Sequence, residues 1–305
     1  PISKTMFEAV KKFFKKVVDM AANSWSGLWN NAMLLEKRLD MLEKKVKDLK
    51  GTPGTDQIEV KAALKLIGQK SFDAASVKNA IVPVTKAMGI LDNSLGFISS
   101  VTDKLEAMIK NGGKTTMSSS EVEKELAELG ANSFEAKDSA RVAKSDIMPG
   151  GRVVVFTVTE TEGAASVSVA IERDEMKDVT EKMAPLNKEA MLAVLKSARE
   201  IFTNLKAKKE QASKLKKVGS DIDGALNKAM SAAKNAPTDA KDDALKAQEE
   251  TLSKSLETIK SVYIAMGNHA TKIVTLSPVM SGEIIRGVID IVGKSANGFK
   301  EAAKS

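Results

Sequence analysis

Residues 153–159 read VVVFTVT and residues 165–171 read ASVSVAI, two short runs rich in β-branched side chains. Apolar and polar residues largely alternate along them, which is typical of strands with one buried face. Glu160-Thr161-Glu162-Gly163 lies between the runs, and Pro149-Gly150-Gly151 precedes the first. The stretch from Arg152 to Arg173 therefore predicts a β-hairpin. Because a lone hairpin is only marginally stable in water, we expect it to pack on helices or to meet a third strand.

On the N-terminal side of this hairpin, apolar residues recur at steps of three and four, the spacing of one helix face. The pattern predicts a helix from about Thr5 to Lys50 and a turn at Gly51 to Asp56. A helical seam then extends from Val60 to Met108, and Pro83 should kink or break it.

A weaker signal lies directly before the hairpin. Serines at 118–120 precede Glu121, which predicts a capped helix start with an acidic first turn and a short helix ending near Leu129. The stretch from Asn132 to Ser145 is ambiguous, and we interpret it as helical in part.

Helical spacing returns at Asn187, with a turn predicted at residues 235–239 and a new segment beginning at Ser277-Pro278. The predicted fold class is mainly α: an elongated bundle of long helices with one inserted β-hairpin, and strand confined almost entirely to Arg152 to Arg173. We expect three domains, in chain order an N-terminal amphipathic helix with a long helical hairpin (1–114), short helices with the β-hairpin (115–186), and a long helical hairpin with a tail helix (187–305).

Composition excludes several classes of protein. The chain has 305 residues, 43% of them hydrophobic and 29% charged, which is typical of globular rather than disordered proteins. It has no cysteine, so disulfides, thiolate metal sites and cysteine catalysis are excluded. No run of about twenty uncharged apolar residues is present, and we therefore predict no transmembrane helix.

The sequence offers no catalytic motif. It contains neither a phosphate-binding loop, nor a dinucleotide-binding glycine pattern, nor a nucleophile elbow. His269 is the only histidine, and no carboxylate stands at metal-ligand spacing from it, so we expect it to be exposed or half-buried. We accordingly predict a non-enzymatic protein without catalytic residues, cofactor or metal.

The N-terminal run from Thr5 to Trp29 predicts a basic amphipathic helix. Its apolar face carries five of the chain's few aromatic residues, Phe7, Phe13, Phe14, Trp25 and Trp29, and lysines lie among them. Such a helix can be buried in a core, lie on a membrane surface, or dock on a partner protein. The sequence alone leaves all three readings open.

Positive charge is carried mainly by lysine. The net charge is +7, and all but six of the 47 basic residues are lysines. Lysine suits non-specific contact with anionic surfaces, whereas arginine favours bidentate recognition of bases and phosphates. The densest lysines are the candidate contacts to DNA or another anionic surface: Lys11, Lys12, Lys15, Lys16, Lys208, Lys209, Lys216 and Lys217. The alternative is that they are solvated faces of a helical bundle.

The segment from Phe7 to Lys47 resembles the mature start of the internal head proteins of phiKZ-like giant bacteriophages. It combines paired phenylalanines and lysines, then Trp25 and Trp29, then the charged run LEKRLDML at residues 35–42. The resemblance implies a protein that lies inside the capsid with the genome, among other virion proteins, and that can be ejected into the host cytoplasm. It also implies a propeptide removed by a prohead protease, which would suit a chain beginning at Pro1; removal of an initiator methionine would suit it equally.

A second resemblance is architectural. Long helices with one internal β-hairpin are similar to ClyA-type α-pore-forming toxins, whose tongue enters a membrane. This hairpin departs from that pattern, because its strands alternate with Thr and Ser and its tip carries Glu160 and Glu162. The expectation from the sequence is therefore a non-enzymatic internal virion protein, with a membrane-active toxin-like protein as the alternative.

Overall fold

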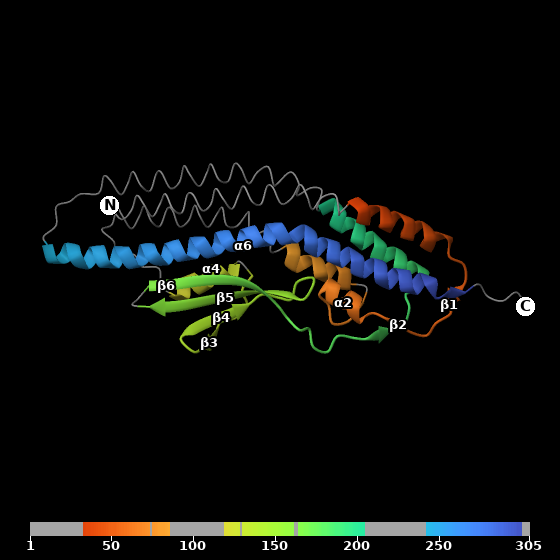
Figure 1. Cartoon of the computed structure of the whole chain (residues 1–305), viewed down its shortest axis with the longest axis horizontal. Helices are drawn as coiled ribbons and strands as arrows, with labels where there is room; N and C mark the ends of the chain where they lie inside the picture. The colour runs from red at the N-terminus through yellow and green to blue at the C-terminus, as the bar shows by residue number, and fades with distance from the viewer. Residues whose placement is uncertain are drawn as a thin grey trace, which may run out of the picture.

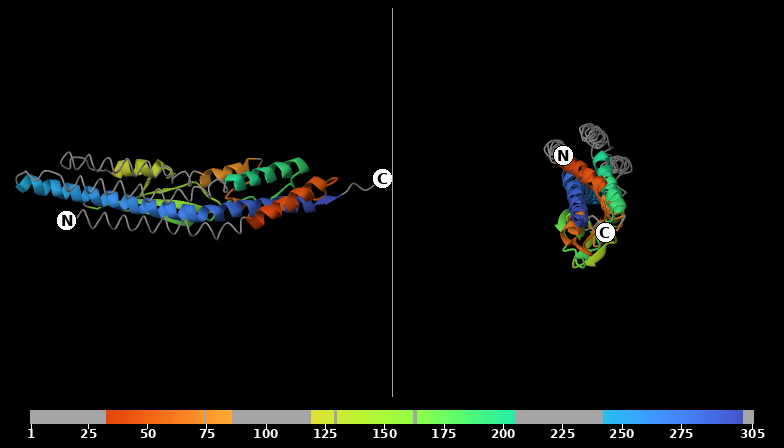
Figure 2. Two further views of the ribbon diagram at one scale, coloured as in Figure 1. Left: turned by 90° about the horizontal axis from the view of Figure 1, so that it is seen from above. Right: turned by 90° about the vertical axis from the view of Figure 1, so that its right-hand side faces the viewer.

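The computed structural model describes residues 33–73, 75–85, 119–128, 130–161, 164–204 and 242–300. The described elements are arranged along one helix, α6 (Asp242–Asn297), which has 56 residues (Figure 1). At 1.5 Å per residue such a helix is about 84 Å long. A β-sheet lies against its N-terminal half, and shorter helices surround its C-terminal half (Figures 1 and 2).

The predicted break at Ser277 and Pro278 is wrong, because α6 continues through both residues. Pro278 has no backbone N–H to donate to the preceding turn. In the same turn, the Ser277 hydroxyl donates a hydrogen bond to the Ile273 carbonyl at 2.7 Å. Ser277 and Met280 are fully buried, so packing on both sides of the proline holds the helix together.

The predicted hairpin is confirmed and belongs to a larger sheet. Strands β5 (Arg152–Thr161) and β6 (Ala164–Arg173) pair antiparallel, with Phe156 opposite Val169. Strands β3 (Glu135–Lys137) and β4 (Ala140–Lys144) extend this to a four-stranded antiparallel sheet in the order β3-β4-β5-β6.

Two short ladders join segments that are distant in the sequence. They pair β1 (Thr52–Pro53) with β8 (Phe299–Lys300), and β2 (Ile58–Glu59) with β7 (Lys182–Met183). The prediction of a mainly α bundle with one hairpin is therefore wrong, and the fold is a mixture of helices and antiparallel sheets. Strand is not confined to the hairpin: the ambiguous stretch before it forms β3 and β4 rather than helix, and the turn after Lys50 contains β1.

The buried face of the sheet carries Phe156, Val158 and Val169. Helix α6 lies along β6, where the Thr258 hydroxyl accepts a hydrogen bond from the Ala165 N–H at 2.9 Å and the Ser261 hydroxyl accepts one from the Val167 N–H at 2.6 Å. The hairpin thus both meets a third strand and packs on a helix.

Helix α4 (Ser119–Glu128) packs against β5. Its described residues extend from the predicted serine run to Glu128, with Glu121 in the first turn, in agreement with the helix predicted from the sequence. Glu123 in α4 forms an ion pair with Arg141 in β4, which fixes the helix to the sheet.

The C-terminal half of α6 is packed on several sides. It contacts α2 (Lys61–Ile67), and it lies beside helices formed by residues 33–48, 76–85 and 188–204 (Figure 2). Contact with α2 is close at Gly287, where a Cβ atom would lie 2.6 Å from a side-chain carbon of Ile67. This half of α6 supplies much of the core: Met280, Ile284, Ile285, Val288, Ile291 and Val292.

The second predicted seam breaks earlier than expected. Helix α2 ends at Ile67, and Gly68 follows with a left-handed backbone (φ 78°), while Pro83 lies inside the helix of residues 76–85. The described part of the first predicted helix, residues 33–48, is helical. The rest of that helix, the seam beyond residue 85 and the turn at 235–239 lie outside the described residues, and the division into three domains stays a prediction.

Candidate anion-binding cleft

None of the site residues predicted from the sequence falls in the described part of the chain. This holds for the aromatic face of the N-terminal helix and for both lysine clusters: Phe7, Phe13, Phe14, Trp25, Trp29, Lys11, Lys12, Lys15, Lys16, Lys208, Lys209, Lys216 and Lys217. Their roles stay predictions. The described residues contain other polar centres.

His269 is buried, contrary to the expectation of an exposed or half-buried side chain. Only 1% of it is accessible, and its ring lies 5.6 Å from that of Phe156. Neither ring nitrogen has a hydrogen-bond partner among the residues that the structure describes. Burial, with a smaller effect from Lys272, lowers the pKa of His269 to about 4. The side chain is therefore neutral at neutral pH and fills space between α6 and the sheet. His269 is four residues from both Ala265 and Ile273, and this helical spacing is the sequence signal that could have predicted its burial.

No metal site accompanies it. Among the residues that the structure describes, no group of three or more His, Cys, Asp or Glu side chains could hold a metal ion. The same residues include no helix with the length and apolar character needed to cross a membrane.

A buried ion pair joins the sheet to α6. Arg152 in β5 and Glu283 in α6 are 8% and 9% accessible, and the guanidinium contacts both carboxylate oxygens, one of them at 3.1 Å. Arg152 also donates to the Pro149 carbonyl at 2.7 Å. Gly150 follows with a left-handed backbone, and a Cβ there would collide with the guanidinium. These groups satisfy one another, so we assign the pair a structural role.

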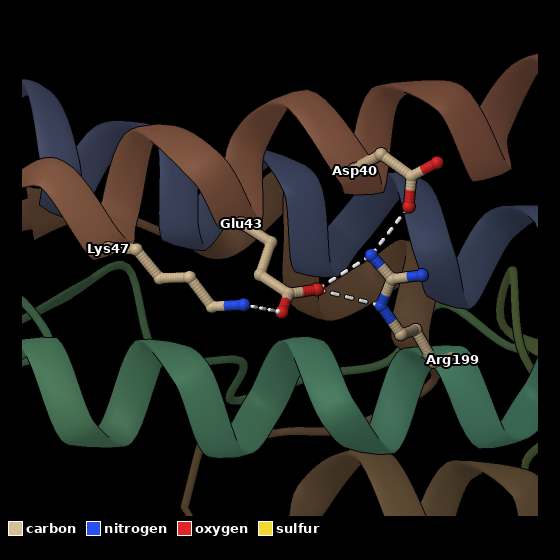
Figure 3. A network of polar contacts seen from close by, with 4 residues as sticks. All are labelled: Asp40, Glu43, Lys47 and Arg199. Atoms are coloured by element: carbon tan, nitrogen blue, oxygen red, sulfur yellow. Dashed lines mark hydrogen bonds and ion pairs between the residues drawn. The ribbon is translucent and has the colours of Figure 1, made fainter.

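A second polar network joins two helices (Figure 3). Arg199, in the helix of residues 188–204, contacts Asp40 at 2.5 Å and Glu43 at 2.8 Å, both in the helix of residues 33–48. Lys47 contacts the other oxygen of Glu43 at 2.7 Å. Hydrogen bonds lower the pKa of Glu43, and the bond from Lys47 has a larger effect than the bond from Arg199. Since every charge has an internal partner, this network holds the helices together and presents no free charge to a ligand.

A cleft of about 450 Å³ has a different character. It lies where α2, the β2–β7 ladder and the C-terminal end of α6 meet, and four lysines and two glutamates line it together with Ala62. The charged residues are Lys61, Lys65, Lys182, Lys294, Glu59 and Glu181.

Only part of this positive charge is neutralised. Lys61 contacts Glu181 at 2.6 Å, and this hydrogen bond is the main cause of the lowered pKa of Glu181. Lys294 contacts Asp290 at 2.7 Å and donates to the Glu59 carbonyl at 3.0 Å. Within the described residues, the side chains of Lys65 and Lys182 form no hydrogen bond or ion pair.

The fold, and not the local sequence, gathers these lysines. Lys61 and Lys65 are one turn apart on α2, β7 places Lys182 opposite Glu59, and Lys294 lies in the last turn of α6. These four lysines are not predicted from the sequence, because they do not form a dense cluster along the chain. The ammonium groups of the cleft can hold an anion.

One comparison with known proteins is informative. A family model described as phiKZ-like phage internal head proteins matches residues 3–275. No curated protein and no solved structure matches the chain.

Proposed function

This chain belongs to the phiKZ-like phage internal head proteins, and on that premise we propose that it is packaged with the genome and contacts DNA weakly, without reading its sequence. As an internal head protein it lies inside the phage capsid. The family match, which extends over residues 3–275, is the observation that carries the proposal.

The charge of the chain supports contact with DNA. A net charge of +7, almost all of it from lysine, suits attraction to phosphates more than the reading of base edges. We further propose a structural, non-enzymatic role, since internal head proteins are structural in general. Contacts with other virion proteins belong to the same proposal.

Binding of duplex DNA as a function of salt tests the DNA contact. Each phosphate contact lowers log affinity by about 0.9 per log unit of salt. Reversing the charge of Lys11, Lys12, Lys15 and Lys16 should therefore reduce the salt slope by up to about 3.6. Reversal at Lys208, Lys209, Lys216 and Lys217 tests the second cluster in the same way.

Shuffling the DNA sequence is the matched control, and it should leave the affinity unchanged. Absence of binding at about 50 mM salt, or binding that ignores both salt and the charge reversals, would refute the proposed DNA contact.

Proteolytic maturation and ejection are further parts of the proposal. Mass spectrometry of the virion form against the full-length gene product tests maturation, which predicts a shorter virion form. Detection of the protein inside freshly infected cells, with protein synthesis blocked, tests ejection. Identical masses would refute the first, and a protein retained wholly in the emptied capsid would refute the second.

A further inference from the structure

We propose that the lysine-lined cleft between α2, the β2–β7 ladder and the end of α6 is a binding site for the backbone phosphates of duplex DNA. The inference rests on the proposed function and adds a site that is separate from the two lysine clusters predicted from the sequence. What carries it is a cleft in which three elements place four ammonium groups, two of which form no hydrogen bond or ion pair within the described residues, although Lys182 is near enough to Glu181 to help lower the pKa of that carboxyl.

The charges of the cleft favour a phosphate over a cation. Lys61 and Lys294 are held by Glu181 and Asp290, which leaves Lys65 and Lys182 as donors with unused capacity. Each ammonium group has three N–H donors and no acceptor. The lining has four lysines against the carboxylates of Glu59 and Glu181, so the cleft is positive overall even when Asp290 beside Lys294 is counted.

The exposure of the cleft suits a polymer rather than an enclosed small molecule. The side chains of Lys61 and Glu181 are 51% and 69% accessible, and that of Lys294 is 40% accessible. Lys61 and Lys65 lie about one helical turn apart, about 6 Å along α2 at 1.5 Å per residue. A strand of DNA lying across the cleft could therefore place successive phosphates near different lysines.

The chemistry of the lining predicts binding without sequence preference. The described residues that line the cleft include no arginine for a bidentate contact with guanine and no aromatic side chain for stacking on bases. Contacts from lysine alone position the phosphate backbone and carry no base information.

The double variant Lys65→Gln with Lys182→Gln tests the site. Within the described residues neither ammonium group forms a hydrogen bond or an ion pair, so the variant should change the melting temperature little. If each lysine contacts one phosphate, the salt slope should fall by about 1.8, and affinity at 0.1 M salt should fall roughly 8-fold per contact.

The matched control is Lys137→Gln with Lys144→Gln in the full-length chain. These two exposed lysines lie on β3 and β4, away from the cleft, and the variant loses the same charge (Figure 1). Its salt slope should change much less than that of the cleft variant. A second measurement is acetylation of lysines with and without DNA, in which DNA should protect Lys65 and Lys182 but not the control pair.

The outcomes separate this inference from the proposed function. If the parent binds DNA and the cleft and control variants behave alike, the cleft is not the site, although the proposed DNA contact stands. If inorganic phosphate, but not DNA, protects Lys65 and Lys182, the cleft holds a small anion and the inference is overturned. If the parent binds no DNA at all, both proposals fall.

Discussion

Removing Glu283 should destabilise the protein far more than removing a surface carboxylate. The Glu283→Ala variant would leave the Arg152 guanidinium, in a residue only 8% accessible, with the Pro149 carbonyl as its remaining partner. Breaking a buried ion pair on one side costs about 3–5 kcal/mol because the other charge stays buried and uncompensated. Urea denaturation, followed by circular dichroism, measures the loss as a lower midpoint.

Two control variants test this prediction. Glu175→Ala removes a carboxylate whose side chain is 83% accessible and 3.9 Å from Lys177, and should change stability by less than about 1 kcal/mol. Replacing both partners, Arg152→Met with Glu283→Leu, should recover most of the loss, since apolar residues of similar volume can replace a buried pair with little cost. A Glu283→Ala loss as small as that of Glu175→Ala, or a double variant worse than the single one, would refute this account of the pair.

Three further changes probe packing, protonation and the N-terminal helix. Gly287→Ala should cost about 1–3 kcal/mol, because its Cβ would lie 2.6 Å from a side-chain carbon of α2, whereas Gly293→Ala in the same helix meets nothing within 4 Å and should be neutral or stabilising in urea titrations. The pKa of His269 falls from 6.5 to about 4 on folding, so the free energy of unfolding is highest above pH 6.5 and decreases as the pH falls toward 4, by roughly 2 kcal/mol at pH 5. The His269→Leu variant should lack this decrease. An unchanged dependence of stability on pH in that variant would contradict the prediction. Phe13→Glu with Phe14→Glu should lower the melting temperature if both rings are core, at roughly 1.5–3 kcal/mol per ring, whereas leakage from anionic liposomes that the same variant abolishes would favour the membrane-active alternative.

Local patterns predicted the elements whose signal is local. The alternation around Phe156 predicted the hairpin, and the serines before Glu121 predicted α4. β3 and β4 were missed because they are short and rich in alanine and charge, and because Asp138 turns between them with a left-handed backbone (φ 54°). The residue preferences of such a stretch favour a helix, but pairing with β5 makes it a strand.

Other features depend on contacts between distant residues. The ladder that places Lys182 opposite Glu59 joins residues more than a hundred positions apart, and no periodicity reports such a pairing. Pro278 looks like a helix breaker until the packing around it is known. The cleft has the same origin, because Lys65 and Lys294 are isolated in the sequence and meet only in the folded chain.

The hydroxyl groups of Thr258 and Ser261 have a consequence for contacts between neighbouring copies of this protein inside a capsid. An edge strand with free N–H groups is a template for pairing with another copy, and can begin aggregation. On β6 these hydroxyls already accept the N–H groups of Ala165 and Val167, so a strand from a neighbouring copy would first have to displace α6. The opposite edge, β3, has only three residues, all exposed and two of them charged. Both edges are thus protected against the growth of the sheet from one molecule to the next.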